Sequence, residues 1–272
     1  MNMTIRTETV KTGDFETDFF RFGRGKRTMV IIPGLSVQSV MLSADAVARE
    51  YSVMEDEFTV FVFDRRRPLP ADCSISALAR GSAAAFDALG LRDICLFGAS
   101  QGGMISLEIA ASRPDLVKKL AVASTSVNVT EENAKAVGEW IEKAARGDGE
   151  GLYLAFGGAL YPPGLFAMFR DALAEAGRAA TGEELERFAV LANAARGFDF
   201  RDRAGEIRCP LFAAGSSDDM VLGGGAIEEI AGVFREKTDF VYHVYKGYGH
   251  AAYDTAPDFR DRLYDFFTRR II

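Results

Sequence analysis

The stretch that decides the fold is Leu96–Ala110, LFGASQGGMISLEIA, in which an apolar run gives way to a helical pattern at a serine between two glycines. The run at residues 93–97 is typical of a buried strand, and a helical pattern follows. Gly98 to Gly102 read Gly-x-Ser-x-Gly, a strand–turn–helix motif. Side chains at the two glycine positions would collide where strand and helix cross, so the spacing predicts a sharp turn that exposes Ser100 as a nucleophile.

Short apolar runs alternate with helical patterns along the rest of the chain. This order predicts an α/β fold with a mostly parallel central sheet, helices on both faces and right-handed crossovers. Residues 4–10 and 15–22 alternate about a Gly-containing turn and predict an opening β-hairpin. Further strands are expected at residues 28–32, 58–63, 93–97, 120–124, 210–215 and 240–245, and helices at residues 76–90, 102–114, 224–236 and 256–270.

Residues 127–203 break the alternation, because they contain helical patterns and no convincing strand. Thr181 and Glu184 have the spacing of a capping box at the start of one of these helices. We therefore expect a helical cap inserted into an α/β core of residues 1–126 and 204–272, over the carboxyl ends of the strands, where ligands gather. The cap residues expected to line a pocket or to pack against the core are Tyr153, Phe156, Phe166, Met168 and Phe169, with Trp140 expected only to pack.

Composition excludes several classes of function. The chain has 272 residues, 48% of them hydrophobic, and a net charge of −7, which disfavours a nucleic-acid partner because phosphate binding needs a basic face. Arg65–Arg67 is the one basic run, and we interpret it as a solvated loop. No apolar stretch approaches the 18 residues or so of a membrane span. The expected partner is a small-molecule substrate.

Cysteines and histidines point to a cytoplasmic chain without a metal or other cofactor. The first 15 residues lack the apolar segment of a secretory leader. Three cysteines lie far apart without a CxxC pair, as expected of reduced, mostly buried thiols. His243 and His250 are the only histidines, and no HExxH-like spacing of metal ligands occurs.

A serine nucleophile needs a base, usually an imidazole oriented by a carboxylate. His250 follows the last expected strand and so falls at the carboxyl edge of the sheet, whereas His243 lies within that strand. The sequence AAGSSDDM supplies two acids at the end of another strand. We favour Asp218 as the acid that orients His250, with Asp219 as the alternative acid or as an N-cap or loop anchor.

Backbone amides near Ser100 are candidates for an oxyanion hole, the set of N–H donors that stabilises a tetrahedral intermediate. VIIPGLSV ends the first parallel strand at the required edge of the sheet. Pro33 has no N–H, so the donor from this turn is Gly34 or Leu35, paired with the N–H of Gln101 after the nucleophile. Because only the Gln101 backbone takes part, its side chain is expected to matter little.

These motifs together resemble the α/β-hydrolase family, in its capped branch of esterases, C–C bond hydrolases and proline iminopeptidase-like enzymes. The resemblance covers essentially the whole chain, through IIPGLS, FVFDRRRP, LFGASQGG, IRCPLFAAGSSDD and GYGHAAY. It implies Ser100 as nucleophile, Asp218 as acid, His250 as base, and Leu35 and Gln101 as oxyanion donors. The sequence departs from the family at Pro33, where the family often has histidine, and after Asp64, where RRRPLPADCS replaces a glycine-rich turn.

The resemblance and the candidate residues predict a cofactor-independent serine hydrolase that cleaves an ester, thioester or amide of a small, largely apolar substrate through an acyl-enzyme. Two alternatives use the same triad, an acyltransferase and a C–C bond hydrolase. A third is a ligand-binding protein without turnover, since a fold does not determine a function.

Overall fold

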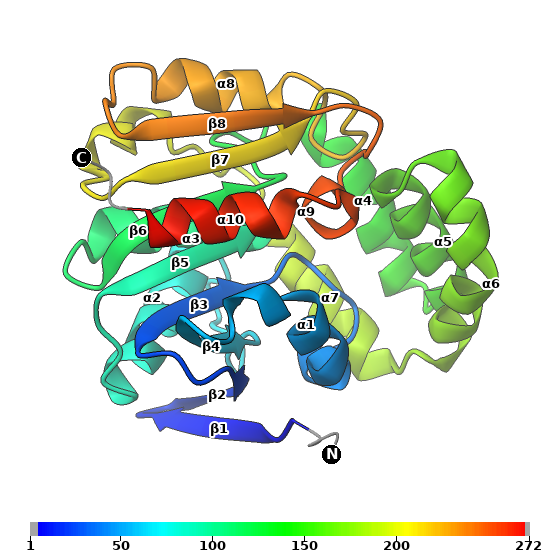
Figure 1. The fold of residues 1–272 in the computed structure, drawn as a ribbon. Helices are drawn as coiled ribbons and strands as arrows, with labels where there is room; N and C mark the ends of the chain where they lie inside the picture. Colours follow the sequence, from blue (N-terminus) through cyan, green and yellow to red (C-terminus); the bar gives the residue numbers. More distant parts are fainter. Residues whose placement is uncertain (1–4, 270–272) are drawn as a thin grey trace.

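An eight-stranded sheet forms the centre of the computed structural model, which describes residues 5–269 (Figure 1). The strand order is β1-β2-β4-β3-β5-β6-β7-β8. The pairs β1–β2 and β2–β4 are antiparallel and the remaining pairs are parallel, which confirms the predicted mostly parallel sheet with a hairpin at one edge. The strands are β1 (Thr7–Thr12), β2 (Phe15–Phe22), β3 (Arg27–Ile32), β4 (Phe58–Phe63), β5 (Ile94–Ala99), β6 (Val117–Ala123), β7 (Leu211–Ser216) and β8 (Phe240–Tyr245).

Helices cover both faces of the sheet because the central strands are apolar on both sides. The helices α2 (Ile75–Ala88), α3 (Gln101–Ser112) and α8 (Ala226–Val233) pack on one face, in one cluster of buried residues. A second cluster on the opposite face includes α1 (Ala44–Glu50) and α10 (Phe259–Thr268). Strand β5 is buried along its whole length between the two layers, which is the expected environment of a central parallel strand.

Several element boundaries differ from the sequence expectation. Strand β7 ends at Ser216, one residue later than expected, and α8 starts two residues later. Five short helices within residues 5–269 were not predicted, because each is too short for a helical period to show in the sequence. They are α1, η1 (Val40–Ser43), η2 (Ser52–Met54), η3 (Arg201–Glu206) and α9 (Ala252–Thr255). Residue 4 of the expected hairpin and residue 270 of the expected last helix lie outside the described residues.

Four helices lie between β6 and β7, beyond the carboxyl ends of the central strands (Figure 1). They are α4 (Asn133–Ala145), α5 (Gly149–Leu160), α6 (Pro163–Ala179) and α7 (Gly182–Asn193).

Local sequence explains how the inserted helices begin and pack. The expected capping box is present: the Thr181 side chain accepts a hydrogen bond from the Glu184 amide, and the Glu184 carboxylate accepts one from the Thr181 amide. A Cβ added at Gly149 would lie 2.2 Å from the Gly177 carbonyl oxygen, so α5 and α6 approach closely only because both positions are glycine. An isolated antiparallel bridge pairs Asn128 with Asp199 where the chain enters and leaves the insertion.

Within residues 5–269, no helix has both the length and the apolar character needed to cross a membrane.

Candidate active site

Ser100 lies at a sharp turn between β5 and α3. Its backbone has φ +52° and ψ −121°, a conformation that is strained for a residue with a side chain. A Cβ at Gly98 would lie 2.3 Å from the Gly102 carbonyl oxygen, and a Cβ at Gly102 would lie 2.1 Å from the carbonyl oxygen of Ile32. Both glycines are therefore required by backbone crossings, and the turn projects the half-buried Ser100 from the end of the sheet.

His250 lies against Ser100, although the two residues are 150 positions apart in the sequence. The loop after β8 carries the imidazole, which is 2% exposed, and its Nε2 is 2.9 Å from the Ser100 Oγ. Its Nδ1 is 2.8 Å from Oδ2 of Asp219. With the proton on Nδ1 donated to this carboxylate, Nε2 is free to accept the Ser100 hydroxyl proton, as general-base chemistry requires.

The structure places Asp219, and not the favoured Asp218, in contact with His250. Asp219 is 5% exposed, and its Oδ1 accepts hydrogen bonds from the amides of Val221 and Leu222 at 2.8 and 2.9 Å. These two bonds fix the carboxylate so that its second oxygen points to the imidazole. The expectation that Asp218 orients His250 is thus corrected by one position, because β7 continues one residue further than its apolar pattern indicates.

Asp218 is exposed and holds the loop that carries the histidine. Its carboxylate accepts hydrogen bonds from the Ser216 hydroxyl at 2.6 Å and from the amides of Gly247 and Gly249 at 2.9 and 3.3 Å. Partial burial acts to raise the pKa of Asp218, but these hydrogen bonds outweigh it and the pKa lies below its usual value. Asp218 therefore anchors the loop, which is one of the roles that the sequence analysis offered for Asp219.

The turn after β3 lies directly against the serine. A Cβ added at Gly34 would be 3.2 Å from the Ser100 Cβ, and both Leu35 and Gln101 line the cavity at the serine. Gln101 is the first residue of α3, where backbone N–H groups have no partner within the helix. In the part of the chain that the structure describes, neither the Leu35 amide nor the Gln101 amide donates to another protein group. Both donors thus remain available to an oxyanion.

The cavity beside Ser100 is narrow and mostly apolar. Measured as the space that the centre of a water molecule can reach, its volume is about 60 Å³. On this measure one water needs roughly 10–15 Å³, so the space suits a small group. Its apolar wall comes from α3, from the segment before α4 and from the inserted helices, and includes Met104, Val129, Val137, Trp140, Phe156 and Leu160.

The expectations for the inserted aromatic residues are met only in part. Trp140, expected only to pack, is 3% exposed and lines the cavity, with its ring edge-to-face on Phe156 at a centroid distance of 4.9 Å. Phe166 packs over Gly157 and Gly158, between α5 and α6. Met168 is 76% exposed, so it neither lines the cavity nor packs against the core.

Two polar residues at the cavity were missed by the sequence analysis. Asn133 donates through Nδ2 to the Leu222 carbonyl at 2.6 Å, and Tyr253 lies one helical turn after His250. Burial raises the pKa of Tyr253 well above its ordinary value, so its phenol stays protonated. No local pattern signalled Tyr253, because α9, which carries it, has only four residues and is too short to show a helical period in the sequence. Within residues 5–269, no group of three or more His, Cys, Asp or Glu side chains is arranged to hold a metal ion.

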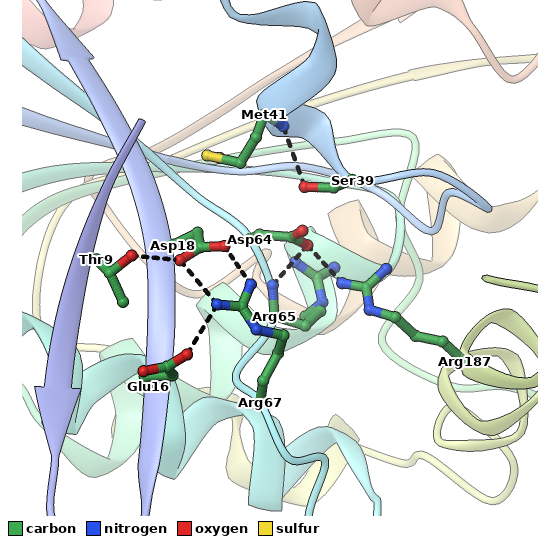
Figure 2. Close-up of polar contacts among 9 residues, drawn as sticks. All are labelled: Thr9, Glu16, Asp18, Ser39, Met41, Asp64, Arg65, Arg67 and Arg187. Atoms are coloured by element: carbon green, nitrogen blue, oxygen red, sulfur yellow. Dashed lines mark hydrogen bonds and ion pairs between the residues drawn. The ribbon is translucent and has the colours of Figure 1, made fainter. Parts of the chain in front are cut away.

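The arginine run after β4 is not a solvated loop, contrary to its sequence interpretation. Arg65 is 5% exposed and donates to the Pro33 carbonyl at 2.8 Å, whereas Arg67 pairs with Asp18 and Glu16 of β2 (Figure 2). The Arg66 guanidinium lies over the Phe15 ring, 3.9 Å from its centroid. Each arginine therefore has its own protein partner, and Arg65 lies at the turn beside Ser100.

Two known proteins are similar in sequence to this chain. A mouse (Mus musculus) protein named serine hydrolase BPHL is 29% identical over 156 residues, which cover 52% of this chain and 53% of that protein. The match thus spans about half the length of this relative. A Rhizobium rhizogenes protein named putative carbamate hydrolase RutD is 27% identical over 187 residues, covering 64% of this chain and 70% of that protein.

The solved structures show the same fold. The crystal structure of MGS-M2, an alpha/beta hydrolase enzyme from a Medee basin deep-sea metagenome library, superposes with a TM-score of 0.85 and 17% identity, over 97% of this chain and 98% of that one. A model of the alpha/beta hydrolase family matches residues 29–261, from β3 into α10. The chain therefore belongs to the alpha/beta hydrolase family.

Proposed function

We propose that the chain is a cofactor-independent serine hydrolase in which Ser100, His250 and Asp219 act as the catalytic triad. The observation that carries this proposal is the continuous contact from the Ser100 Oγ through the His250 ring to the Asp219 carboxylate, at 2.9 and 2.8 Å. These are the distances at which a general base takes a hydroxyl proton and a carboxylate holds the imidazolium that forms.

The proposed reaction has two halves that share one intermediate. The Ser100 Oγ attacks the carbonyl carbon of an ester, thioester or amide while its proton passes to His250 Nε2. The oxyanion accepts hydrogen bonds from the Leu35 and Gln101 amides, and the leaving group departs with the proton from His250. Water then attacks the acyl-enzyme, gives its proton to His250, and the acid leaves as Ser100 regains its hydroxyl.

The cavity indicates the size of the acyl group. Its volume of about 60 Å³ and its apolar wall of Trp140, Phe156 and Met104 favour a short, largely apolar acyl chain or a small ring. Two of the matched relatives are named a serine hydrolase and a putative carbamate hydrolase. We therefore include carbamates as well as esters among the substrates to be screened.

The first test is covalent labelling with a small fluorophosphonate, read by intact mass. We expect one adduct on the natural chain and none on Ser100→Ala, because only an activated serine is phosphonylated. Ser112→Ala is the matched control. Ser112 lies at the other end of α3, where its hydroxyl donates to the Glu108 carbonyl, so this variant should label fully.

Hydrolysis of p-nitrophenyl esters of increasing acyl length, with a p-nitrophenyl carbamate beside them, tests the substrate class. We expect the highest kcat/KM for short acyl chains, and Ser100→Ala should lose on the order of a millionfold in kcat. A folded natural chain that takes no adduct and hydrolyses none of these compounds would overturn the proposal and favour a non-catalytic binding protein.

A further inference from the structure

Arg65 is a buried cation without a carboxylate partner. The side chain follows β4, is 5% exposed, and within residues 5–269 no carboxylate oxygen lies within 4.0 Å of its guanidinium nitrogens. The adjacent carboxylate, Asp64, instead forms an ion pair with Arg187 of α7 at 2.6 Å (Figure 2). It also accepts a hydrogen bond from the Arg65 backbone amide at 2.7 Å. The Arg65 Nε is also buried without a hydrogen-bond partner. Burial of a charge without an ionic partner costs free energy of folding, which suggests that Arg65 is kept for a function.

The two side-chain hydrogen bonds that the structure shows for Arg65 reach both segments that supply the proposed oxyanion donors. Its Nη2 donates to the Pro33 carbonyl at 2.8 Å and to the Gln101 side-chain Oε1 at 3.3 Å. The Pro33 carbonyl belongs to the peptide group immediately before the Gly34–Leu35 turn. Gln101 carries the second donor on its own backbone. A single guanidinium nitrogen thus connects the turn after β3 to the first residue of α3.

The far end of the Gln101 side chain is fixed as well. Its Nε2 donates to the Leu191 carbonyl of α7 at 2.6 Å, and the whole residue is 4% exposed. The side chain therefore spans from Arg65 to the inserted helices. The sequence analysis expected the Gln101 side chain to matter little to the oxyanion, and no local pattern indicated these two contacts.

We infer that Arg65 is a positioning residue that holds the Leu35 and Gln101 amides in place and directs its positive charge toward the oxyanion formed at Ser100. The inference rests on the proposed serine-hydrolase function. Arg65 does not line the cavity, so it acts through Pro33 and Gln101 and not by touching the substrate.

Electrostatics favours this role. A fixed positive charge in a water-poor site stabilises a developing oxyanion more than it stabilises a neutral carbonyl, so its effect falls on the transition state. The neighbouring charges are Asp64 and Arg187, which pair with each other. Burial lowers the pKa of Arg65 to about 10, against the opposing effect of Asp64, and the guanidinium stays charged at neutral pH.

The test compares Arg65→Met, Arg65→Lys and Arg66→Met. For Arg65→Met we expect kcat for a short p-nitrophenyl ester to fall by about 10- to 100-fold while KM changes by less than about threefold. Arg65→Lys keeps the charge and a single donating nitrogen, and should recover part of the loss. Added guanidinium chloride at non-denaturing concentrations should also raise the rate of Arg65→Met and leave the natural chain unchanged. Arg66→Met removes the neighbouring charge, which lies over Phe15, and should keep the natural kcat.

Ligand binding separates positioning of the oxyanion site from a general loss of structure. A boronic acid forms an anionic tetrahedral adduct on Ser100, and its Kd should rise about 10- to 100-fold in Arg65→Met, in step with kcat. The Kd of the matching neutral carboxamide should change by less than about threefold, because a neutral ground-state ligand does not use the charge.

Three outcomes would overturn the inference: an unchanged kcat in Arg65→Met, an equal loss in Arg66→Met, or an equal weakening of the boronate and the carboxamide. A natural chain that is not labelled at Ser100 by the fluorophosphonate would instead overturn the proposed function. Labelling of the natural chain together with any of the three outcomes above would overturn the inference about Arg65 alone.

Discussion

Asp218 and Asp219 are neighbours in the chain, yet their carboxylates hold different parts of the site. Asp219 is fixed by the Val221 and Leu222 amides and faces His250, while Asp218 faces solvent and binds the Gly247 and Gly249 amides. The first contact orients the His250 ring itself, and the second positions the loop that carries it.

Substitution of each aspartate by asparagine should therefore have very different effects. Asp219→Asn keeps the shape of the side chain but favours the wrong tautomer of His250, and we expect a loss of about ten-thousandfold in kcat. Asp218→Asn weakens hydrogen bonds worth about 1 kcal/mol in total, which corresponds to a loss of about tenfold or less.

Steady-state hydrolysis of one ester by both variants, with circular dichroism spectra as the check on folding, decides between the two assignments. A larger loss in Asp218→Asn than in Asp219→Asn would show that the triad acid is Asp218 and that the contact with Asp219 is structural.

Sequence alone indicated the neighbourhood of these residues but not which aspartate contacts His250. Ser100 and His250 both follow strands, and the carboxyl ends of parallel strands meet at one edge of the sheet, so their approach was predictable. Which aspartate reaches His250 depends on where β7 ends, which is set by pairing of Ser216 with Tyr245 of β8, 29 residues away. The burial of Arg65 likewise depends on Pro33 and Gln101, which no local pattern indicates.

At the scale of elements, long patterns were predicted well and short ones were not. The apolar runs of β3 to β8 and the capping box of α7 each carry a local signal that the fold confirms. The four-residue helix α9 places Tyr253 at the cavity, but four residues are too few to show a helical period.

Two polar side-chain contacts, both buried or half-buried, are among those that attach helix α7 to the core. Arg187 pairs with Asp64 at 2.6 Å, and their side chains are only 21% and 10% exposed (Figure 2). The Leu191 carbonyl accepts a hydrogen bond from the Gln101 side-chain Nε2 at 2.6 Å. Because Ala192 and Ala195, at the end of α7 and just after it, line the cavity, these contacts set the position of one cavity wall.

Arg187→Met should loosen this attachment. It leaves the Asp64 carboxylate half-buried without its cation, and we expect the free energy of unfolding to fall by about 1–3 kcal/mol. The measurement is the urea midpoint, followed by fluorescence of the single tryptophan, Trp140, which lies in the inserted helices.

The matched control for Arg187→Met is Arg178→Met on α6. Its ion pair with Glu150 is exposed, with side chains 57% and 44% accessible, so its removal should cost at most about 0.5 kcal/mol. Equal midpoints for the two variants would contradict the anchoring role of Arg187.

For the whole molecule, carboxyl groups with lowered pKa values link stability to pH. At Asp87, Asp115, Asp199 and Glu206, hydrogen bonds from arginine are the main cause of the lowered pKa. At Asp18, partial burial acts to raise the pKa, but hydrogen bonds from Arg67 and Thr9 outweigh it. A carboxyl whose pKa is lower in the folded chain than in the unfolded chain contributes stability above its unfolded value, and that stability is lost as pH falls through the folded value.

Asp18 offers the clearest test because its side chain is only 15% exposed and binds Arg67 through both oxygens, which joins β2 to the segment after β4 (Figure 2). At neutral pH, Asp18→Asn should lower the free energy of unfolding by about 1 kcal/mol, a value that allows for screening of the exposed Arg67. Near pH 3, below the ordinary pKa of about 3.9, the natural chain should have lost much of this advantage.

The predicted signature is therefore a flatter dependence of the urea midpoint on pH in Asp18→Asn than in the natural chain. Arg67→Met should flatten it in the same way, because it removes the partner that lowers the pKa of Asp18. Arg24→Met removes the same charge together with an ion pair to Asp56 whose side chains are 77% and 71% exposed, and so controls for the loss of an exposed, ion-paired arginine. If all three variants kept the slope of the natural chain, the Asp18–Arg67 contact would have no part in acid unfolding, and the other arginine-bound carboxyls would account for it.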